Sequence, residues 1–216
     1  MKPGDFKTKQ EQLWAGDHTK AYIQRSDSPQ LRASKAAVFA EILAHTRGVN
    51  SVIEFGANIG LNLRAIRHFL PDAKLSALEI NETALEALRK IEGLDVYPGS
   101  LLEFTPRQTW DIAFTMGVLI HVNPERLRDA YDLLYNASHR YVCIIEYYNP
   151  SPLMIMHRGQ EDQMFKRDFA GELLQAHPDL NLLEYGFVYR GDPVFPLDDV
   201  TWFLFEKPQG GLPPVR

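Results

Sequence analysis

One short segment carries the clearest chemical signal in the chain. It reads Val52-Ile53-Glu54-Phe55-Gly56-Ala57-Asn58-Ile59-Gly60, and the apolar-periodic stretch 61–70 follows at once. Glycine lets the backbone turn tightly and lets a ligand approach without a Cβ in the way. Open α/β sheets bind their ligands at the carboxyl ends of the strands. The segment therefore predicts a strand, a ligand-binding turn and the start of a helix.

This turn differs from two common phosphate-binding loops. A dinucleotide fingerprint needs glycines at positions 58 and 61, where the chain has Asn58 and Leu61. A P-loop needs a Gly-Lys-Ser/Thr sequence after the turn, and none follows here. Binding of a pyrophosphate at this turn thus loses its main support.

A carboxylate ends the next predicted strand. It is Glu79, in Ala77-Leu78-Glu79-Ile80-Asn81. In a parallel sheet such an acid lies beside the glycine turn, and its two oxygens can accept hydrogen bonds from a ribose diol. Taken alone, Glu79 could be an ordinary strand-end acid on a solvated turn. Together, the turn and the acid predict a nucleoside-binding site.

Apolar strands alternate with amphipathic helices around these residues. Strands are predicted at 51–55, 74–80, 94–97, 110–116, 141–147, 182–189 and 200–206, and helices at 61–70, from Ser28-Pro29, from Asn81, from Asn123-Pro124 and at 165–177. This alternation predicts a parallel sheet covered on both faces and doubly wound. The stretch 149–159, rich in Pro and Ser, is predicted to be a loop.

The chain divides into three parts. Residues 1–28 are polar with isolated aromatics and are predicted to form an N-terminal lid or cap. Residues 29–207 are predicted to form the main domain, with an insertion at about 149–170. Residues 208–216 are predicted to form a flexible tail.

Composition and charge narrow the function classes. The 216 residues are 45% hydrophobic and 24% charged, which suits a folded globular chain. A formal net charge of -5 gives no basic field to attract a nucleic acid or an anionic membrane. No apolar run is long enough for a membrane span and no signal peptide is visible, so the expected location is the cytoplasm. Cys143 is predicted to be a buried thiol, and no metal-ligand spacing is present.

The glycine segment, Glu79 and the Asp-led strand 110–116, with its apolar turn ending in His121, resemble the class I S-adenosylmethionine-dependent methyltransferases over about residues 30–147. A narrower similarity is to the methylases associated with pseudaminic acid biosynthesis. It is carried by Gln12-Leu13-Trp14-Ala15-Gly16-Asp17, Asn58-Ile59-Gly60-Leu61-Asn62-Leu63, Glu79-Ile80-Asn81, Glu146-Tyr147-Tyr148-Asn149-Pro150, Phe165-Lys166-Arg167-Asp168-Phe169-Ala170-Gly171-Glu172 and Asp198-Asp199-Val200-Thr201-Trp202-Phe203. The resemblance implies an α/β, Rossmann-like, doubly wound fold with a mostly parallel seven-strand sheet and one antiparallel strand near the C-terminus. It also implies an enzyme that uses S-adenosyl-L-methionine.

The resemblance assigns a donor site. Glu54 would reach the ligand's ammonium or only order the glycine loop. Ile80 would pack on the adenine, and Met116-Gly117 would lie near the sulfonium. Trp14 and Tyr22 would cover the donor or only pack the N-terminal helix, and Arg25 would pair with its carboxylate or stay solvated. The expected cofactor-binding residues are Trp14, Tyr22, Arg25, Glu54, Gly56, Ala57, Asn58, Gly60, Glu79, Ile80, Ser100, Leu101, Met116 and Gly117.

An acceptor side is expected next to the donor. His121 is a candidate general base or a residue that positions backbone, Glu146 is a second candidate base, and Tyr147 is a candidate stacking surface. Local positive charge after residue 149 would suit an anionic acceptor, although each of these residues could also lie on a solvated helix face. The expected substrate-binding residues are Asn149, Arg158, Lys166, Arg167 and Trp202.

The resemblance implies methyl transfer and suggests a sugar or nucleotide sugar as the acceptor, and the residues of the acceptor side favour a small polar or anionic molecule. Two alternatives stay open. The acceptor could be a protein or RNA group, although the net negative charge argues against RNA. The chain could also be a catalytically silent partner protein that only binds the donor. No metal, no membrane partner and no particular oligomeric state is predicted.

Overall fold

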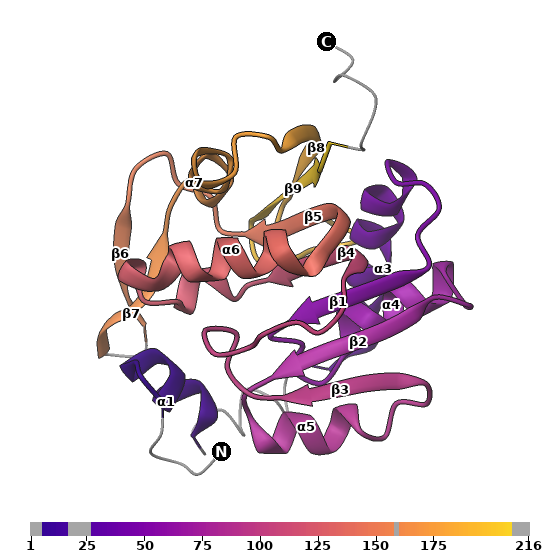
Figure 1. Ribbon diagram of the computed structural model, residues 1–216, viewed down its shortest axis with the longest axis horizontal. Coiled ribbons are helices and arrows are strands. Elements are labelled where there is room, and N and C mark those ends of the chain that lie inside the picture. The colour runs from indigo at the N-terminus through magenta and orange to yellow at the C-terminus, as the bar shows by residue number, and fades with distance from the viewer. Residues whose placement is uncertain (1–5, 17–26, 158–159, 209–216) are drawn as a thin grey trace.

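The computed structural model describes residues 6–16, 27–157 and 160–208. Its centre is a seven-stranded sheet in the order β3-β2-β1-β4-β5-β9-β8 (Figure 1). The strands are β1 (Ser51–Phe55), β2 (Lys74–Glu79), β3 (Leu94–Pro98), β4 (Trp110–Met116), β5 (Ser138–Glu146), β8 (Asn181–Val188) and β9 (Val200–Glu206). Neighbours from β3 to β5 pair in parallel, whereas β9 is antiparallel to both β5 and β8. The predicted sheet and its one antiparallel strand are confirmed.

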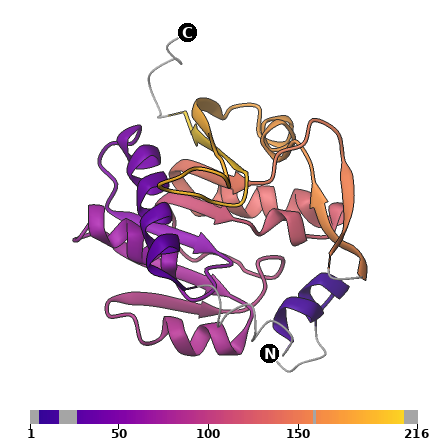
Figure 2. The ribbon, with the colours of Figure 1, turned by 180° about the vertical axis from the view of Figure 1, so that it is seen from behind.

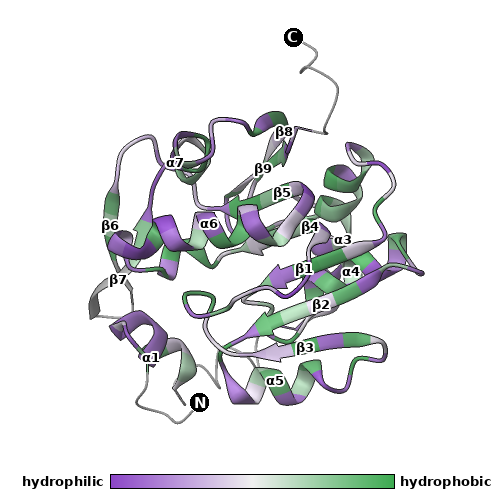
Figure 3. Ribbon diagram, in the orientation of Figure 1, coloured by the Kyte–Doolittle hydropathy of each residue, from purple (hydrophilic) through white to green (hydrophobic). Residues whose placement is uncertain are grey.

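Helices cover both faces of this sheet. On one face lie α3 (Pro29–Ala44), α4 (Leu61–Phe69) and α5 (Glu82–Leu88), best seen from behind (Figure 2). On the other lie α6 (Leu127–Ala137) and α7 (Phe169–Ala176) (Figure 1). Each face has its own cluster of buried apolar side chains. Polar and apolar residues alternate along α6, whose buried residues face the sheet (Figure 3).

Local signals explain where several helices begin. The Ser28 hydroxyl accepts a hydrogen bond from the Leu31 N–H at 3.1 Å, and Pro29 opens α3. The Asn81 side chain caps α5 by accepting from the Thr83 N–H at 3.0 Å. Both caps lie where the sequence predicts them.

The predicted insertion has a different structure from the one expected. Strand β6 (Leu153–His157) pairs antiparallel with β7 (Gln160–Lys166), where a loop was predicted for 149–159. The predicted helix 165–177 is too long at its start, because Phe165 belongs to β7 and Asp168 caps α7 by accepting from the Gly171 N–H. The fourfold spacing of Phe165 and Phe169 is compatible with a helix, but pairing with β6 holds Phe165 in a strand.

A short helix represents the N-terminal segment among the described residues. Helix α1 (Lys9–Ala15) is fixed by a capping box, in which Thr8 and Glu11 bond each other's backbone N–H groups. Short 3-10 turns η2 (Leu119–His121) and η3 (Pro124–Arg126) precede α6. No helix of the described chain is long and apolar enough to cross a membrane.

Candidate functional site

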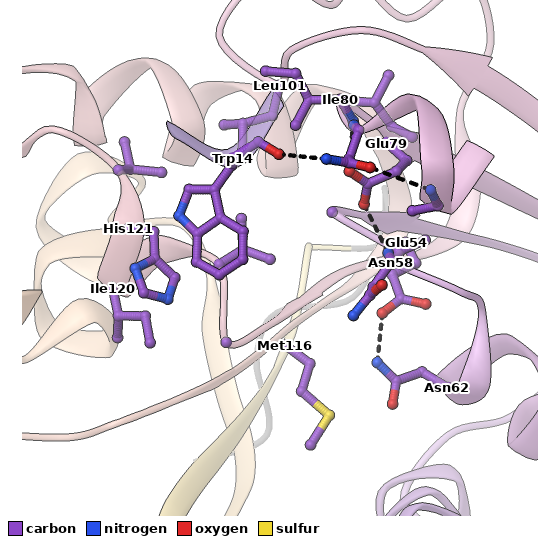
Figure 4. A pocket seen from close by; sticks show the side chains of 18 of the residues that line it. Trp14, Glu54, Asn58, Asn62, Glu79, Ile80, Leu101, Met116, Ile120 and His121 are labelled. Atoms are coloured by element: carbon purple, nitrogen blue, oxygen red, sulfur yellow. Dashed lines mark hydrogen bonds between the residues drawn. The ribbon is translucent and has the colours of Figure 1, made fainter. Parts of the chain in front are cut away.

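A cavity of about 390 Å³ lies at the carboxyl ends of β1, β2 and β4. Helix α1 and the η2 turn form its opposite wall, and Trp14 and His121 point into it (Figure 4). The residues of the predicted site that line this cavity are Trp14, Glu54, Gly56, Ala57, Asn58, Glu79, Ile80, Ser100, Leu101, Met116, Gly117, His121 and Tyr147. The fold thus brings residues from six separated segments to one place.

The glycine turn shapes the floor of the cavity. Gly56 has a φ of 77°, and a Cβ at this position would lie 2.6 Å from the Val118 Cγ2 atom. The Gly56 and Ala57 N–H groups both donate to the Leu78 carbonyl, at 2.8 and 3.1 Å, which ties the turn to β2. A side chain at residue 56 would therefore strain the backbone and push against the η2 side of the cavity.

Gly60 has a different role from the predicted one. It begins α4 with a φ of 79° and does not line the cavity. A Cβ there would lie 2.6 Å from the Ile91 Cδ1 atom and 2.9 Å from the Leu88 Cδ2 atom. Its lack of a side chain serves the packing of α4 against the end of α5.

The Glu79 carboxylate is buried and organises the loop above it. One oxygen accepts the N–H groups of Ile80 and Asn81, each at 2.8 Å, and the other accepts the Asn58 N–H at 2.7 Å (Figure 4). Burial raises the pKa of Glu79, and these three hydrogen bonds oppose that rise. A carboxylate offers about four acceptor positions, so the oxygen that faces Asn58 keeps capacity for a further donor.

A chain of polar side chains crosses the far end of the cavity. Asn62 donates its amide to one oxygen of the buried Glu54, and the Lys35 ammonium donates to the Asn62 amide oxygen at 2.6 Å. The same ammonium lies 3.5 Å from the Met116 sulfur. The second oxygen of Glu54 is buried and has no hydrogen-bond partner among the described residues. Burial raises the pKa of Glu54 and lowers that of Lys35, while the attraction between the two charges opposes both changes.

Sequence reasoning missed Lys35 and the pairing of Asn62. A signal was present, because Lys35 lies four residues after Leu31 and three before Val38, within the apolar stripe of α3. A charged residue on a buried helix face needs a partner. Which partner it meets depends on how α3 packs beside α4.

Helix α1 is attached to the sheet by its own polar residues. Ser100 donates its hydroxyl to Glu11, and the Asn81 amide donates to the Trp14 carbonyl at 2.8 Å and to the Gly16 carbonyl at 3.3 Å. These bonds hold Trp14 over the cavity. They also join α1 to the loop that Glu79 organises, because Asn81 is bonded to both.

Glu146 lies beneath the η2 turn, outside the lining of the cavity. One of its oxygens accepts the Val118 and Leu119 N–H groups at 2.9 and 3.0 Å and the Thr115 hydroxyl at 3.3 Å. Its second oxygen is buried without a hydrogen-bond partner in the described chain, and burial raises its pKa to about 7. Glu146 therefore holds the turn that carries His121. The prediction that it is a base in contact with the acceptor is wrong.

Of the residues expected to bind an anionic acceptor, Asn149, Lys166 and Arg167 are described by the structure and do not line the cavity. Arg167 binds Glu172 at 2.7 Å, and the Lys166 ammonium lies 4.9 Å from the centre of the Tyr147 ring. Asn149 is half-buried in the loop that follows β5, where its side-chain amide donates a hydrogen bond to the Ser151 carbonyl. Arg167 is thus paired with a carboxylate outside the cavity, and Lys166 contacts a ring that lines it.

Trp202 is wrongly predicted as well, because it belongs to the core. It is 1% exposed and packs in the cluster between the sheet and α3. Three other expected residues, Tyr22, Arg25 and Arg158, lie outside the described residues. Within the described residues no group of three or more His, Cys, Asp or Glu side chains could hold a metal ion.

No protein-family model matches the chain, and no curated protein sequence matches it. Solved structures do match. The S-adenosylmethionine-bound amino pentose methyltransferase CalS10 of Micromonospora echinaspora superposes with a TM-score of 0.63 at 14% identity, over 89% of this chain and 97% of that one. The chain has the fold of these methyltransferases. DesVI of Streptomyces venezuelae gives 0.64 at 14% identity, over 90% and 99% of the two chains. The 1,6-didemethyltoxoflavin-N1-methyltransferase of Burkholderia thailandensis gives 0.62 at 18% identity, over 90% and 92%.

Proposed function

We propose that this protein transfers a methyl group from S-adenosylmethionine to a small polar acceptor. The observation that supports the proposal is one cavity with a polar group at each end, each of which suits a different part of the donor. At one end Glu79 keeps an acceptor for a ribose hydroxyl, and at the other Lys35 and Glu54 present opposite charges to a zwitterion. The fold it shares with methyltransferases supports the same donor.

The nucleoside end would lie between β2 and β3. Ile80 and Leu101 offer apolar side chains for an adenine ring, and they lie on the same side of the cavity as Glu79 (Figure 4). Because three of the four acceptor positions of Glu79 are taken by backbone N–H groups, it offers the ribose about one strong hydrogen bond.

The amino-acid end would lie over the glycine turn. The unpaired oxygen of Glu54 suits an ammonium group, and the Lys35 ammonium suits a carboxylate. Asn62 lies between them, holds both in place, and separates their charges. This assigns to Lys35 the role that the sequence suggested for Arg25.

S-adenosylmethionine supplies an electrophilic methyl group on a sulfonium. The work of the chain is to align the acceptor with that group and to exclude water. Trp14 and Tyr147 place aromatic faces along the cavity, which suit a positive sulfonium. The Trp14 ring lies 4.5 Å from the His121 ring, between centroids.

The acceptor class is inferred from helix α1, which covers the cavity, and from the sequence and structural similarities. A cavity roofed by α1 suits a small molecule better than a protein or RNA strand. A sugar acceptor is supported by the sequence resemblance to the pseudaminic acid-associated methylases and by a structural neighbour described as an amino pentose methyltransferase.

Calorimetry with S-adenosylhomocysteine tests the donor assignment. We expect Glu79→Gln, Lys35→Met and Glu54→Gln each to weaken binding at least about tenfold, which corresponds to about 1.4 kcal/mol. Matched controls are Glu184→Gln and Lys74→Met, since Glu184 lies on edge strand β8 and Lys74 is exposed at the opposite ends of the strands. Unchanged affinity in folded Glu79 and Lys35 variants would contradict the assignment. A protein that binds the donor yet methylates no acceptor would be the silent partner instead.

A further inference from the structure

The cavity has an unequal set of ionisable side chains. Within the described residues, those that line it are the carboxylates of Glu11, Glu54, Glu79 and Asp198 and only two groups that can be cationic, Lys35 and His121. A cleft lined mainly by one sign of charge concentrates ligands of the other sign. Among the described residues that line the cavity, acidic side chains thus outnumber basic ones, which favours a cation over an anion.

The single lysine has no spare charge to offer a second anion. Its ammonium bonds Asn62, and the negative charges of Glu54 and Asp198 both act on it. In the proposed function it also holds the donor's carboxylate. An acceptor with its own carboxylate or phosphate would find no counter-ion in the described part of the cavity.

The two basic residues of the insertion whose side chains the structure describes, Lys166 and Arg167, do not supply one either. Arg167 is held by Glu172, whose second oxygen accepts the Tyr131 hydroxyl at 2.9 Å. Lys166 lies over the face of Tyr147 at 4.9 Å. Neither lines the cavity, and the insertion contributes the apolar side chain of Met164 instead.

The wall opposite Glu79 is aromatic and apolar. Trp14, Ile120 and His121 lie across the cavity from Glu79 (Figure 4), and Tyr147 and Met164 also line the cavity. Aromatic faces bind cations and pack against the C–H faces of sugar rings, but they repel anions. One face of Tyr147 already holds the ammonium of Lys166, which shows the preference of this ring for a cation.

We propose that the acceptor is an amine on a small molecule without a negative charge near the reacting nitrogen, and that His121 takes its proton. The inference rests on the proposed function. The amine enters as an ammonium and passes one proton to the His121 imidazole, which releases it to water. The nitrogen lone pair then forms the new N–C bond as the methyl carbon–sulfur bond breaks. That bonding pair stays on sulfur, and the product is a methylammonium.

An amine suits this wall better than a hydroxyl does. Imidazole is a weaker base than an alkylamine by about four pKa units, so taking a proton from an ammonium is uphill, but it is far less uphill than taking one from an alcohol. Glu146 does not line the cavity, so it offers the acceptor no second base there. The half-buried His121 faces the same cavity as the carboxylates of Glu54 and Glu79, which favour an ammonium as it arrives.

The test compares matched probes on the protein saturated with S-adenosylhomocysteine. Two triplets are used: glucosamine, glucose and glucuronate, and benzylamine, benzyl alcohol and benzoate. Ligand-observed NMR titration should give the amine of at least one triplet at least about fivefold tighter binding than its acid, or about 1 kcal/mol. Asp198→Asn should reduce that preference by at least about half, whereas Glu184→Gln, on the exposed edge strand, should not.

The outcomes separate this inference from the proposed function. Affinity for S-adenosylhomocysteine, measured on the same samples, tests the donor alone. If the donor product binds but the acids bind as well as the amines, or if no amine binds at millimolar concentration, the inference is wrong and the proposed function stands.

With labelled S-adenosylmethionine, the bound amine should give an N-methyl product. His121→Gln should lower its rate about tenfold or more near neutral pH and recover part of that loss at alkaline pH. Preferential O-methylation would overturn the inference.

Discussion

Replacing Glu146 with glutamine should change how the stability of the protein depends on pH. The carboxylate is buried beneath the η2 turn, and burial raises its pKa to about 7 from an ordinary value of 4.5. The folded chain therefore holds this proton more tightly than the unfolded chain does. The raised pKa of Glu146 stabilises the folded protein fully below its ordinary pKa of 4.5, and this stabilisation is lost as the pH rises through about 7.

The size of the effect follows from the two pKa values. Their difference corresponds to about 3 kcal/mol of unfolding free energy between acidic and alkaline pH. Glutamine cannot ionise, and its carbonyl oxygen can still accept the Val118 and Leu119 N–H groups. We expect Glu146→Gln to be as stable as the parent near pH 5 and more stable near pH 8, by up to about 3 kcal/mol.

Urea denaturation of both proteins, from about pH 5 to about pH 8, measures the difference directly. Glu184→Gln is the control, because that residue lies on the exposed edge strand and its charge is not buried. The reasoning fails if the stability curves of Glu146→Gln and the parent run parallel over this range. Methyl transfer by the same variant separates the two roles. If Glu146 only holds the η2 turn, the variant should keep most of the methyl-transfer rate. If Glu146 were a base in contact with the acceptor, the variant would lose most of it.

Further predictions concern the two glycines and the cysteine. Gly60→Ala should lower the unfolding free energy by about 1–2 kcal/mol, because its positive φ disfavours a side chain, and should leave S-adenosylhomocysteine affinity in the folded protein within about twofold. Gly56→Ala should lower the unfolding free energy by a similar amount. It should also weaken S-adenosylhomocysteine binding at least about tenfold, because the new Cβ would meet Val118 at the cavity floor. Equal affinities of the Gly60→Ala and Gly56→Ala variants for S-adenosylhomocysteine would contradict these separate roles. Cys143 is buried, and burial raises the pKa of its thiol, so a thiol reagent should label it only in denaturant; rapid labelling of the native protein would refute its burial.

Local patterns explain why much of the fold is predictable from the sequence. The strands β1, β2 and β4 are apolar runs, and Ser28 and Asn81 cap helices through bonds to residues two or three positions away. Such signals act over a few residues, so they can be read without knowing the tertiary structure. The glycine turn and Glu79 come together for a general reason: parallel strands bring their carboxyl ends to one edge of a sheet.

The sequence by itself thus determined the α/β class, the glycine turn and the acid beside it. Only the tertiary structure decided that Lys35 reaches Asn62 and Glu54, that Glu146 lies under a turn rather than in the cavity, and that Arg167 is bound to Glu172. Each of these outcomes depends on which side chains of separate elements face each other. That is set by helix rotation and strand pairing, which spacing along the chain does not specify.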